Sequence, residues 1–288
     1  MITHEITLPD GAGVLYRHAD FPSRYVPARH VDVWLPPGCV PLSPWERAGV
    51  RATYPVLYMH DGQNLFLPGY SYGGVPWDVH VAATRLIETG IIPGVIIVGV
   101  WNVGDNRWGE YLPQKPADTP QGRAIAAPFS DRLPGPVCSD AYLKFLVEEV
   151  KPFIDATYRT QPDQSHTFVM GSSMGGLISL YAVSEYPRVF GGAGCVSTHW
   201  VAGENFMVDY FGAALPDPLD HKLYFDYGTH TADAAYEPFQ LRMDEHLAAR
   251  GYQREVNWLT RKFDGAEHSE TAWRARVHLP LSFLLGGS

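Results

Sequence analysis

The sequence contains few cysteines, no long apolar run and no cluster of basic residues. Its 288 residues include three cysteines, Cys39, Cys138 and Cys195, whose wide spacing fits neither a disulfide framework nor a CxxC metal site. No stretch approaches the roughly 18 consecutive apolar residues that indicate a membrane-spanning helix. The formal net charge of −9, without a basic stripe, argues against nucleic acid and membrane surfaces as partners.

The amino terminus also lacks the features of a secretory signal. Residues 1–5 contain no Lys or Arg and no apolar run, so we expect a cytoplasmic protein, the alternative being a secreted protein without its signal. A hydrophobic content of 45% is ample for one large core, and 288 residues are too few for two full domains. We therefore expect a single domain over residues 1–288.

Segments of strand length alternate with segments of helical periodicity through most of the chain. This alternation predicts a mostly parallel central sheet with helices on both faces. Residues 95–100 are apolar on both faces and are expected to form a central parallel strand. The Pro-rich residues 40–53 predict an irregular surface segment. Strands are expected at 30–35, 56–59, 95–100, 166–170, 191–197, 223–227 and 255–260, and helices at 77–89, 139–154, 177–186, 238–250 and 270–285.

The stretch Gly171-Ser172-Ser173-Met174-Gly175 lies between a predicted strand and a predicted helix. A Gly-x-Ser-x-Gly pattern in this context is typical of a nucleophile elbow, where glycine avoids a Cβ clash in a sharp turn. The alternative is an ordinary Gly/Ser turn, because the pattern alone is common by chance. As a nucleophile, the Ser173 hydroxyl needs a base and an orienting acid elsewhere in the chain.

His268 is the candidate base among twelve histidines. It follows the last predicted strand and precedes the last predicted helix, where the base belongs in the order serine, acid, histidine of the α/β-hydrolases. The alternative for His268 is a solvated loop histidine.

The acid is expected after the predicted strand 223–227. Asp233 is the first choice because it lies just beyond the end of this strand, on the side where a triad would assemble. Asp226 is the second choice, and its direction depends on the pleat of the strand. Glu237 is the third choice. The carboxylates not used as the acid are expected to cap turns or helices.

Two backbone N–H groups are expected to stabilise the oxyanion of a tetrahedral intermediate. One belongs to Met174, directly after the nucleophile, and the other to Gln63 in the loop after strand 56–59, where Gly62 allows close approach. The alternative for this loop is a simple turn. His60 and Asp61 lack a third ligand at suitable spacing, so no metal site is predicted.

Several motifs together resemble the putative esterase (esterase D-like) family of α/β-hydrolases, which includes feruloyl and acetyl xylan esterases, siderophore esterases and mycolyltransferases. The resemblance extends over residues 29–285. It is carried by residues 54–66, by Gly99-Val100-Trp101-Asn102 with Arg107 and Glu110-Tyr111, by residues 171–176, and by residues 265–269 with Trp273.

The resemblance implies an α/β-hydrolase fold and an ester-cleaving site without a cofactor. It places the nucleophile at Ser173, the base at His268 and the oxyanion donors at Gln63 and Met174. Many family members carry the acid soon after a Gly-Thr pair. Here Gly228-Thr229 is followed by His230 and Thr231, and Asp233 is the first carboxylate.

Residues 101–137 form a long non-periodic segment that is expected to contribute to the substrate pocket. Long loops in compact domains are usually functional, and the aromatic content of this one argues against disorder. Candidate binding residues are Arg107, Trp108, Tyr111, His199 and Trp200, whose aromatic rings suit a sugar face or an aromatic acyl group. Arg107 is expected either to bind a substrate anion or to pair with Glu110.

These features predict a serine carboxylic-ester hydrolase that acts on small or sugar-linked acyl esters through an acyl-enzyme. An acyltransferase of mycolyltransferase type is the first alternative, with an alcohol in place of water. A serine peptidase is a further alternative. A non-catalytic binding protein on the same fold is the least favoured, because both Ser173 and His268 are present.

Overall fold

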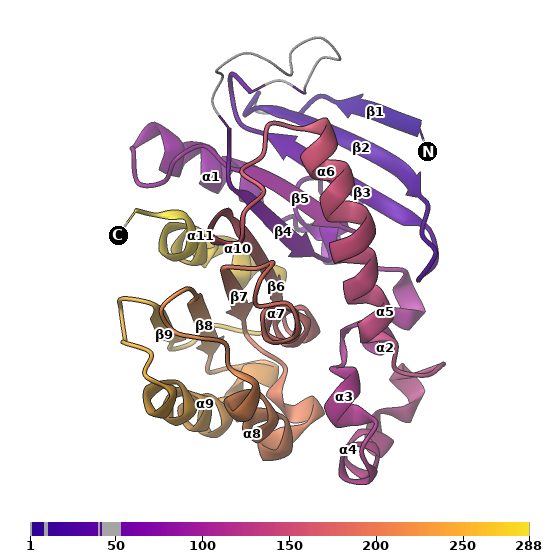
Figure 1. The fold of residues 1–288 in the computed structure, drawn as a ribbon, viewed down its shortest axis with the longest axis vertical. Coiled ribbons are helices and arrows are strands. Elements are labelled where there is room, and N and C mark those ends of the chain that lie inside the picture. Colours follow the sequence, from indigo (N-terminus) through magenta and orange to yellow (C-terminus); the bar gives the residue numbers. More distant parts are fainter. Residues whose placement is uncertain (1, 9–10, 40, 42–52, 288) are drawn as a thin grey trace.

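The computed structural model describes residues 2–8, 11–39, 41 and 53–287. In this part of the chain nine strands form one sheet in the order β1-β2-β3-β5-β4-β6-β7-β8-β9 (Figure 1). The strands are β1 (Ile2–Ile6), β2 (Val14–Phe21), β3 (Arg29–Leu35), β4 (Val56–His60), β5 (Ile96–Val100), β6 (Thr167–Ser172), β7 (Gly192–Val196), β8 (Lys222–Gly228) and β9 (Trp258–Phe263).

Most of the sheet is parallel, as predicted. Strands β4 to β9 pair in parallel, whereas β1, β2 and β3 form an antiparallel extension at one end (Figure 1). Strand β5 joins the two regions: it pairs in parallel with β4 but antiparallel with β3. The expectation that residues 95–100 form a parallel strand was therefore wrong for the pairing with β3. A strand buried on both faces does not reveal the direction of its neighbours.

Both faces of the central strands are buried, and this fixes how the helices pack. In β4, Val56 and Tyr58 belong to one apolar cluster, and the intervening Leu57 and Met59 belong to another. Successive side chains of a strand point to opposite faces, so each cluster lies on its own side of the sheet. This arrangement confirms the predicted α/β fold with two covered faces.

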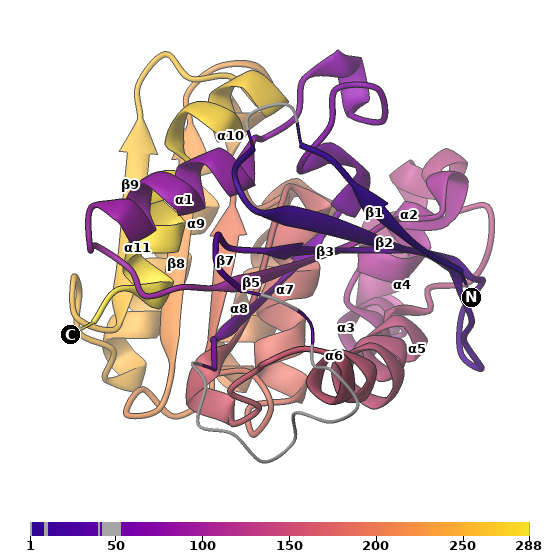
Figure 2. The same cartoon turned by 90° about the horizontal axis from the view of Figure 1, so that it is seen from above.

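Helices α1, α10 and α11 pack on one face, and α5 to α9 pack on the other (Figure 2). Among the described helices, none is long and apolar enough to cross a membrane. The helices are α1 (Val79–Glu88), α2 (Arg107–Tyr111), α3 (Gln114–Ala117), α4 (Pro120–Ala126), α5 (Ser139–Lys144), α6 (Lys151–Thr157), α7 (Met174–Glu185), α8 (Glu204–Ala214), α9 (Glu237–Arg250), α10 (Glu270–Arg276) and α11 (His278–Leu285). The described residues also form helical segments of 3₁₀ or π geometry, which are η1 (Gly62–Asn64), η2 (Tyr72–Gly74), η3 (Gly104–Asn106), η4 (Ala127–Arg132), η5 (Phe145–Val150), η6 (Gln164–His166), η7 (Trp200–Ala202) and η8 (Thr231–Ala235).

Two predicted helices differ from the expectation at prolines. The predicted helix 270–285 is divided at Val277 into α10 and α11, and Pro280 near the start of α11 has no N–H to donate to the preceding turn. The helix after Ser139 contains a π-helical segment, η5 (Phe145–Val150), which ends two residues before Pro152. A wider turn here accommodates a proline ring that would otherwise meet a carbonyl of the preceding turn.

The segment 101–137 is not one loop. It contains η3 (Gly104–Asn106), α2, α3, α4 and η4 (Ala127–Arg132), helices too short to give a periodic signal in the sequence. Strand β9 begins at Trp258 rather than at residue 255. The predicted irregular segment 40–53 lies outside the described residues except for positions 41 and 53.

Candidate active site

Ser173 occupies the sharp turn between β6 and α7. Its φ and ψ angles are 58° and −122°, a combination that is strained for a residue with a side chain. Its N–H donates to the carbonyl of Val196 at 2.9 Å, so neighbouring β7 holds the turn in place. Met174 begins α7, and its N–H has no acceptor within the helix.

Two glycines are required by close backbone contacts near this turn. A Cβ on Gly171 would lie 2.9 Å from the backbone carbon of Gly175, so the elbow closes too tightly for a side chain. A Cβ on Gly62 would lie 2.5 Å from the backbone carbon of Gly99. Gly62 thus lets η1 (Gly62–Asn64), which contains Gln63, approach the backbone of β5.

The structure brings Asp233 and His268 together. Asp233 lies in η8 (Thr231–Ala235) after β8, and its Oδ1 is 2.5 Å from Nδ1 of His268, in the loop between β9 and α10. The backbone N–H of His268 donates to Oγ1 of Thr231 at 2.8 Å, and this hydrogen bond fixes the two loops relative to each other. The contact leaves Nε2 as the ring nitrogen of His268 that is not engaged by the acid.

Three donors surround the Asp233 carboxylate. Besides His268, the hydroxyl of Ser197 and the N–H of Gly228 each donate to Oδ2 at 2.6 Å. Burial raises the pKa of Asp233, but these hydrogen bonds outweigh it and hold the pKa below its ordinary value. The carboxylate is therefore ionised and oriented at neutral pH.

Asp226, the second choice for the acid, has a different partner. Its Oδ1 lies 3.0 Å from Nη2 of Arg276, and it accepts further hydrogen bonds from Tyr224 and from the Ser197 N–H. Burial raises its pKa, although the ion pair with Arg276 opposes this shift. The pleat of β8 thus directs Asp226 into a buried ion pair and not to His268. Glu237, the third choice, pairs with Lys262 at 2.8 Å.

Ser197 is a residue that the sequence reasoning missed. Its hydroxyl donates to Asp233 and accepts from Nε1 of Trp273 at 3.0 Å and from Nη2 of Arg276 at 2.8 Å. It therefore connects the Asp233–His268 pair with the Asp226–Arg276 pair. Its place directly after β7, at the carboxyl edge where the other site residues lie, was the signal available in the sequence.

Ser173, His268 and Gln63 line one cavity of about 870 Å³. The cavity opens at the carboxyl ends of the parallel strands, because the loops after β4, β6 and β9 supply these three residues. Its wall also includes Trp108 from α2, Tyr70, Tyr72, Trp273 and Glu270.

Arg107 lines the cavity, but its guanidinium is bound to the carboxylate of Asp61. Its Nε and Nη2 each lie 2.7 Å from the Asp61 carboxylate, which also accepts from Asn102. The expected alternative, an ion pair of Arg107 with Glu110, was wrong, because Glu110 is fully buried against Arg29. Burial raises the pKa of Asp61, and the charge of Arg107 outweighs this and lowers it.

Three of the five candidate binding residues are not part of the cavity wall. Tyr111 and Trp200 are fully buried: the Tyr111 hydroxyl accepts from the Asp61 N–H at 3.2 Å, and Trp200 donates to Gln240 at 3.1 Å. His199 hydrogen-bonds to the Tyr236 hydroxyl at 2.6 Å, and burial lowers its pKa to about 3. These side chains are therefore held by contacts within the protein and do not face the cavity.

No metal site is visible in the described part of the chain: no group of three or more His, Cys, Asp or Glu side chains is arranged to hold an ion. His60 is buried with its Nδ1 2.8 Å from the Tyr142 hydroxyl, and Asp61 is occupied by Arg107.

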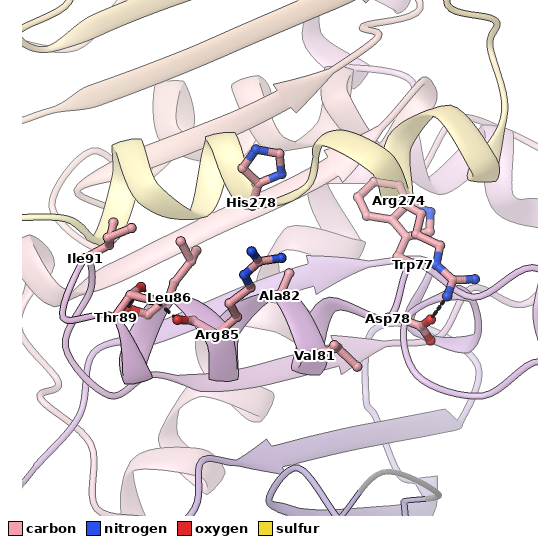
Figure 3. Close-up of a pocket in the computed structure, with 10 residues that line it drawn as sticks. All are labelled: Trp77, Asp78, Val81, Ala82, Arg85, Leu86, Thr89, Ile91, Arg274 and His278. Atoms are coloured by element: carbon pink, nitrogen blue, oxygen red, sulfur yellow. Dashed lines mark hydrogen bonds and ion pairs between the residues drawn. The ribbon is translucent and has the colours of Figure 1, made fainter.

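Other cavities lie away from Ser173. Figure 3 shows one of about 530 Å³ between α1 and the segment α10–α11, lined by Leu86 and Arg85 of α1 on one side and by His278 of α11 on the other. Arg274 at its end forms an ion pair with Asp78. Ser173, His268 and Asp233 do not line this cavity.

A comparison with protein families identifies the group to which the fold and motifs belong. A family model described as putative esterase matches residues 28–279. The chain belongs to the putative esterase family. This confirms the resemblance carried by the sequence motifs, and membership of the family supports a carboxylic-ester hydrolase.

One sequence relative and two solved structures show what this chain is similar to. The protein YbbA of Bacillus subtilis (strain 168), described as uncharacterized, is 26% identical over 153 residues; the match spans 51% of this chain and 51% of YbbA, about half the length of that relative. A ferulic acid esterase superposes with a TM-score of 0.63 at 18% identity, covering 99% of this chain and 97% of that chain. An IroE-like serine hydrolase from Shewanella oneidensis gives 0.68 at 17% identity, covering 98% and 78%. At these low identities the TM-scores show that the fold is shared.

Proposed function

We propose that this protein is a serine carboxylic-ester hydrolase with Ser173 as nucleophile, His268 as base and Asp233 as acid. The observation that carries the proposal is the 2.5 Å contact of Asp233 with His268 Nδ1, beside a cavity lined by both His268 and the strained Ser173. An acid bound at Nδ1 keeps that nitrogen protonated and leaves Nε2 to accept a proton.

In the acylation step, Oγ of Ser173 attacks the ester carbonyl as Nε2 of His268 takes the hydroxyl proton. The carbonyl oxygen becomes an oxyanion, which accepts hydrogen bonds from the N–H groups of Gln63 and Met174. The C–O bond to the alcohol then breaks, and His268 returns the proton to the departing alkoxide. Asp233 stabilises the imidazolium while it is present.

In the deacylation step, water takes the place of the alcohol. His268 removes a proton from water as its oxygen attacks the acyl carbonyl, and the second tetrahedral intermediate forms against the same two N–H groups. Collapse of this intermediate breaks the bond to Ser173 Oγ, which recovers its proton from His268. The products are a carboxylic acid and an alcohol, and no cofactor takes part.

A fluorophosphonate probe tests the proposal without knowledge of the substrate, because it labels activated serines. We expect labelling at Ser173, mapped by peptide mass spectrometry, and its loss in Ser173→Ala and His268→Ala. The neighbouring Ser172, which is 4% exposed, gives a matched control: Ser172→Ala should still be labelled.

Labelling at a different serine, or esterase activity retained by Ser173→Ala, would contradict the proposed mechanism. Product analysis with a short-chain ester, in water alone and with a sugar acceptor, separates hydrolysis from acyl transfer. Release of free acid in both conditions supports hydrolysis, and formation of a sugar ester supports the transferase alternative.

A further inference from the structure

Glu270 is a carboxylate of the active-site cavity that accepts a hydrogen bond from its own backbone N–H but has no side-chain partner among the described residues. It lies two residues after His268, at the start of α10, and its side chain lines the same cavity as Ser173. No side chain in the described part of the chain forms a hydrogen bond or an ion pair with it. Because Glu270 is half-buried, water replaces such a partner only in part.

The charges around the cavity leave Glu270 uncompensated. The wall contains four carboxylates and two guanidinium groups. Arg107 is bound to Asp61 by two hydrogen bonds, and Arg132 lies over the ring of Trp108 at 5.5 Å. The cavity wall therefore has an excess of negative charge, and Glu270, the carboxylate without a side-chain partner, lies close in the chain to the proposed base His268.

The environment of Glu270 disfavours its own ionised form. Burial raises the pKa of this carboxyl, and the nearby charge of Asp61 raises it further, whereas the hydrogen bond from its own N–H and the charges of His268 and Arg107 act in the opposite direction. A positive charge placed on the substrate would relieve this cost, because it would pair with Glu270 within the partly desolvated cavity.

Aromatic rings complete a site suited to a cation. Tyr70, Tyr72, Trp108 and Trp273 line the same cavity. The faces of such rings attract cations, with the strongest attraction at tryptophan. Two of these rings already bind a cation of the protein, because Arg17 lies over Tyr70 at 4.5 Å and Arg132 over Trp108 at 5.5 Å. An anionic substrate, by contrast, would meet the carboxylate of Glu270, which no guanidinium neutralises by direct contact in the described part of the chain.

We propose that Glu270 selects ester substrates that carry a positively charged ammonium group, which it binds by a charge-assisted hydrogen bond or ion pair beside the aromatic wall. This inference rests on the proposed function, since it assigns a substrate class to the same site. Glu270 contacts the substrate away from the reacting carbonyl and thus determines specificity without taking part in proton transfer.

Two thioesters of the same shape test the role of Glu270. Acetylthiocholine carries a trimethylammonium group, and 3,3-dimethylbutyl thioacetate carries a neutral tert-butyl group in its place; both release a thiol that is followed by absorbance. We expect wild-type kcat/KM to be about tenfold higher for the cationic ester, as one partly buried charge pair allows. In Glu270→Gln the ratio of the two values should fall to about one. Glu267→Gln, an exposed glutamate of the same loop, is the matched control and should keep the wild-type ratio.

A wild-type ratio near one, or a ratio unchanged in Glu270→Gln, would overturn the assignment. An equal loss for both esters would also overturn it, because Glu270 would then support His268 or the fold. Binding of phenyltrimethylammonium, measured by calorimetry, tests the same contact without turnover: weaker binding to Glu270→Gln supports the proposal, and equal binding contradicts it. Absence of fluorophosphonate labelling at Ser173 would instead reject the proposed function, so the two failures are distinguishable.

Discussion

The hydroxyl of Ser197 donates a 2.6 Å hydrogen bond to Oδ2 of Asp233, while His268 approaches the other oxygen, Oδ1, at 2.5 Å. Ser197 also accepts from Trp273 and Arg276, so its hydroxyl hydrogen is directed at Asp233 and its lone pairs are used elsewhere. The orientation of the proposed acid thus depends on a serine of the neighbouring strand end.

Ser197→Ala should lower kcat while leaving KM for a short-chain ester nearly unchanged. The variant removes one hydrogen bond to a buried carboxylate, which is worth about 1.5–3 kcal/mol, so we expect kcat to fall about 10- to 100-fold. Steady-state kinetics on 4-nitrophenyl acetate measure the effect. Ser184→Ala, which removes only a hydrogen bond to the carbonyl of Leu180 in α7, is the control. An unchanged kcat in Ser197→Ala would show that Asp233 is held without it.

Asp233→Asn should mainly lower kcat, whereas Asp226→Asn should mainly lower stability. Asp233→Asn is expected to lower kcat by about four orders of magnitude, because an amide does not stabilise the imidazolium and favours the wrong tautomer. Asp226→Asn leaves buried Arg276 without its counter-ion and should mainly lower the free energy of unfolding. Parallel measurements of kcat and of urea unfolding separate the two effects. A larger loss of kcat in Asp226→Asn would reverse the assignment of the acid.

Gly62→Ala should damage the loop that carries Gln63. A Cβ at position 62 would lie 2.5 Å from the backbone of Gly99, so η1 would have to move away from β5 and take the Gln63 N–H with it. Because one oxyanion donor is worth a factor of about 10² to 10³, we expect a loss of that order in kcat. Gly69→Ala is the matched control, since a Cβ there meets nothing within 4 Å. Equal activity of both variants would argue against the Gln63 N–H as a donor.

The positions of the central strands along the chain and the tight turn at Ser173 were predictable because local signals fix them. Apolar runs such as Val56 to Met59 identified buried strands, and the glycines around Ser173 identified a turn too tight for side chains. The antiparallel pairing of β5 with β3 was not predictable in this way, because a buried strand has the same composition beside either kind of neighbour.

The contacts of charged and aromatic side chains were harder to predict from the sequence. Arg107 is three residues from Glu110, but it pairs with Asp61, which is distant in the chain, because the turn after β4 lies against α2. Tyr111 and Trp200 were expected in the pocket, yet their rings fill the space beneath it. Composition indicates that a loop is aromatic, and only the packing shows which ring faces solvent.

His60 lies beneath the proposed site and makes the stability of the protein depend on pH. Its side chain is 2% exposed, and burial lowers its pKa to about 3 from an ordinary value of 6.5. Because the folded-state pKa is the lower one, the unfolded state binds more protons between these values. The free energy of unfolding should therefore fall as the pH drops below about 6.5, by about 1.4 kcal/mol per pH unit for this one group.

The contribution of His60 can be separated from that of its hydrogen bond. His60→Phe keeps a ring of similar size without a titrating group, so its free energy of unfolding should depend less steeply on pH between 6.5 and 4.5. Tyr142→Phe removes the 2.8 Å contact with Nδ1 but leaves the imidazole buried, so it should keep the wild-type slope at a lower overall stability. Urea unfolding at several pH values measures both. If His60→Phe retains the full wild-type slope, other buried groups such as His18, whose pKa burial lowers to about 4, must account for the acid sensitivity.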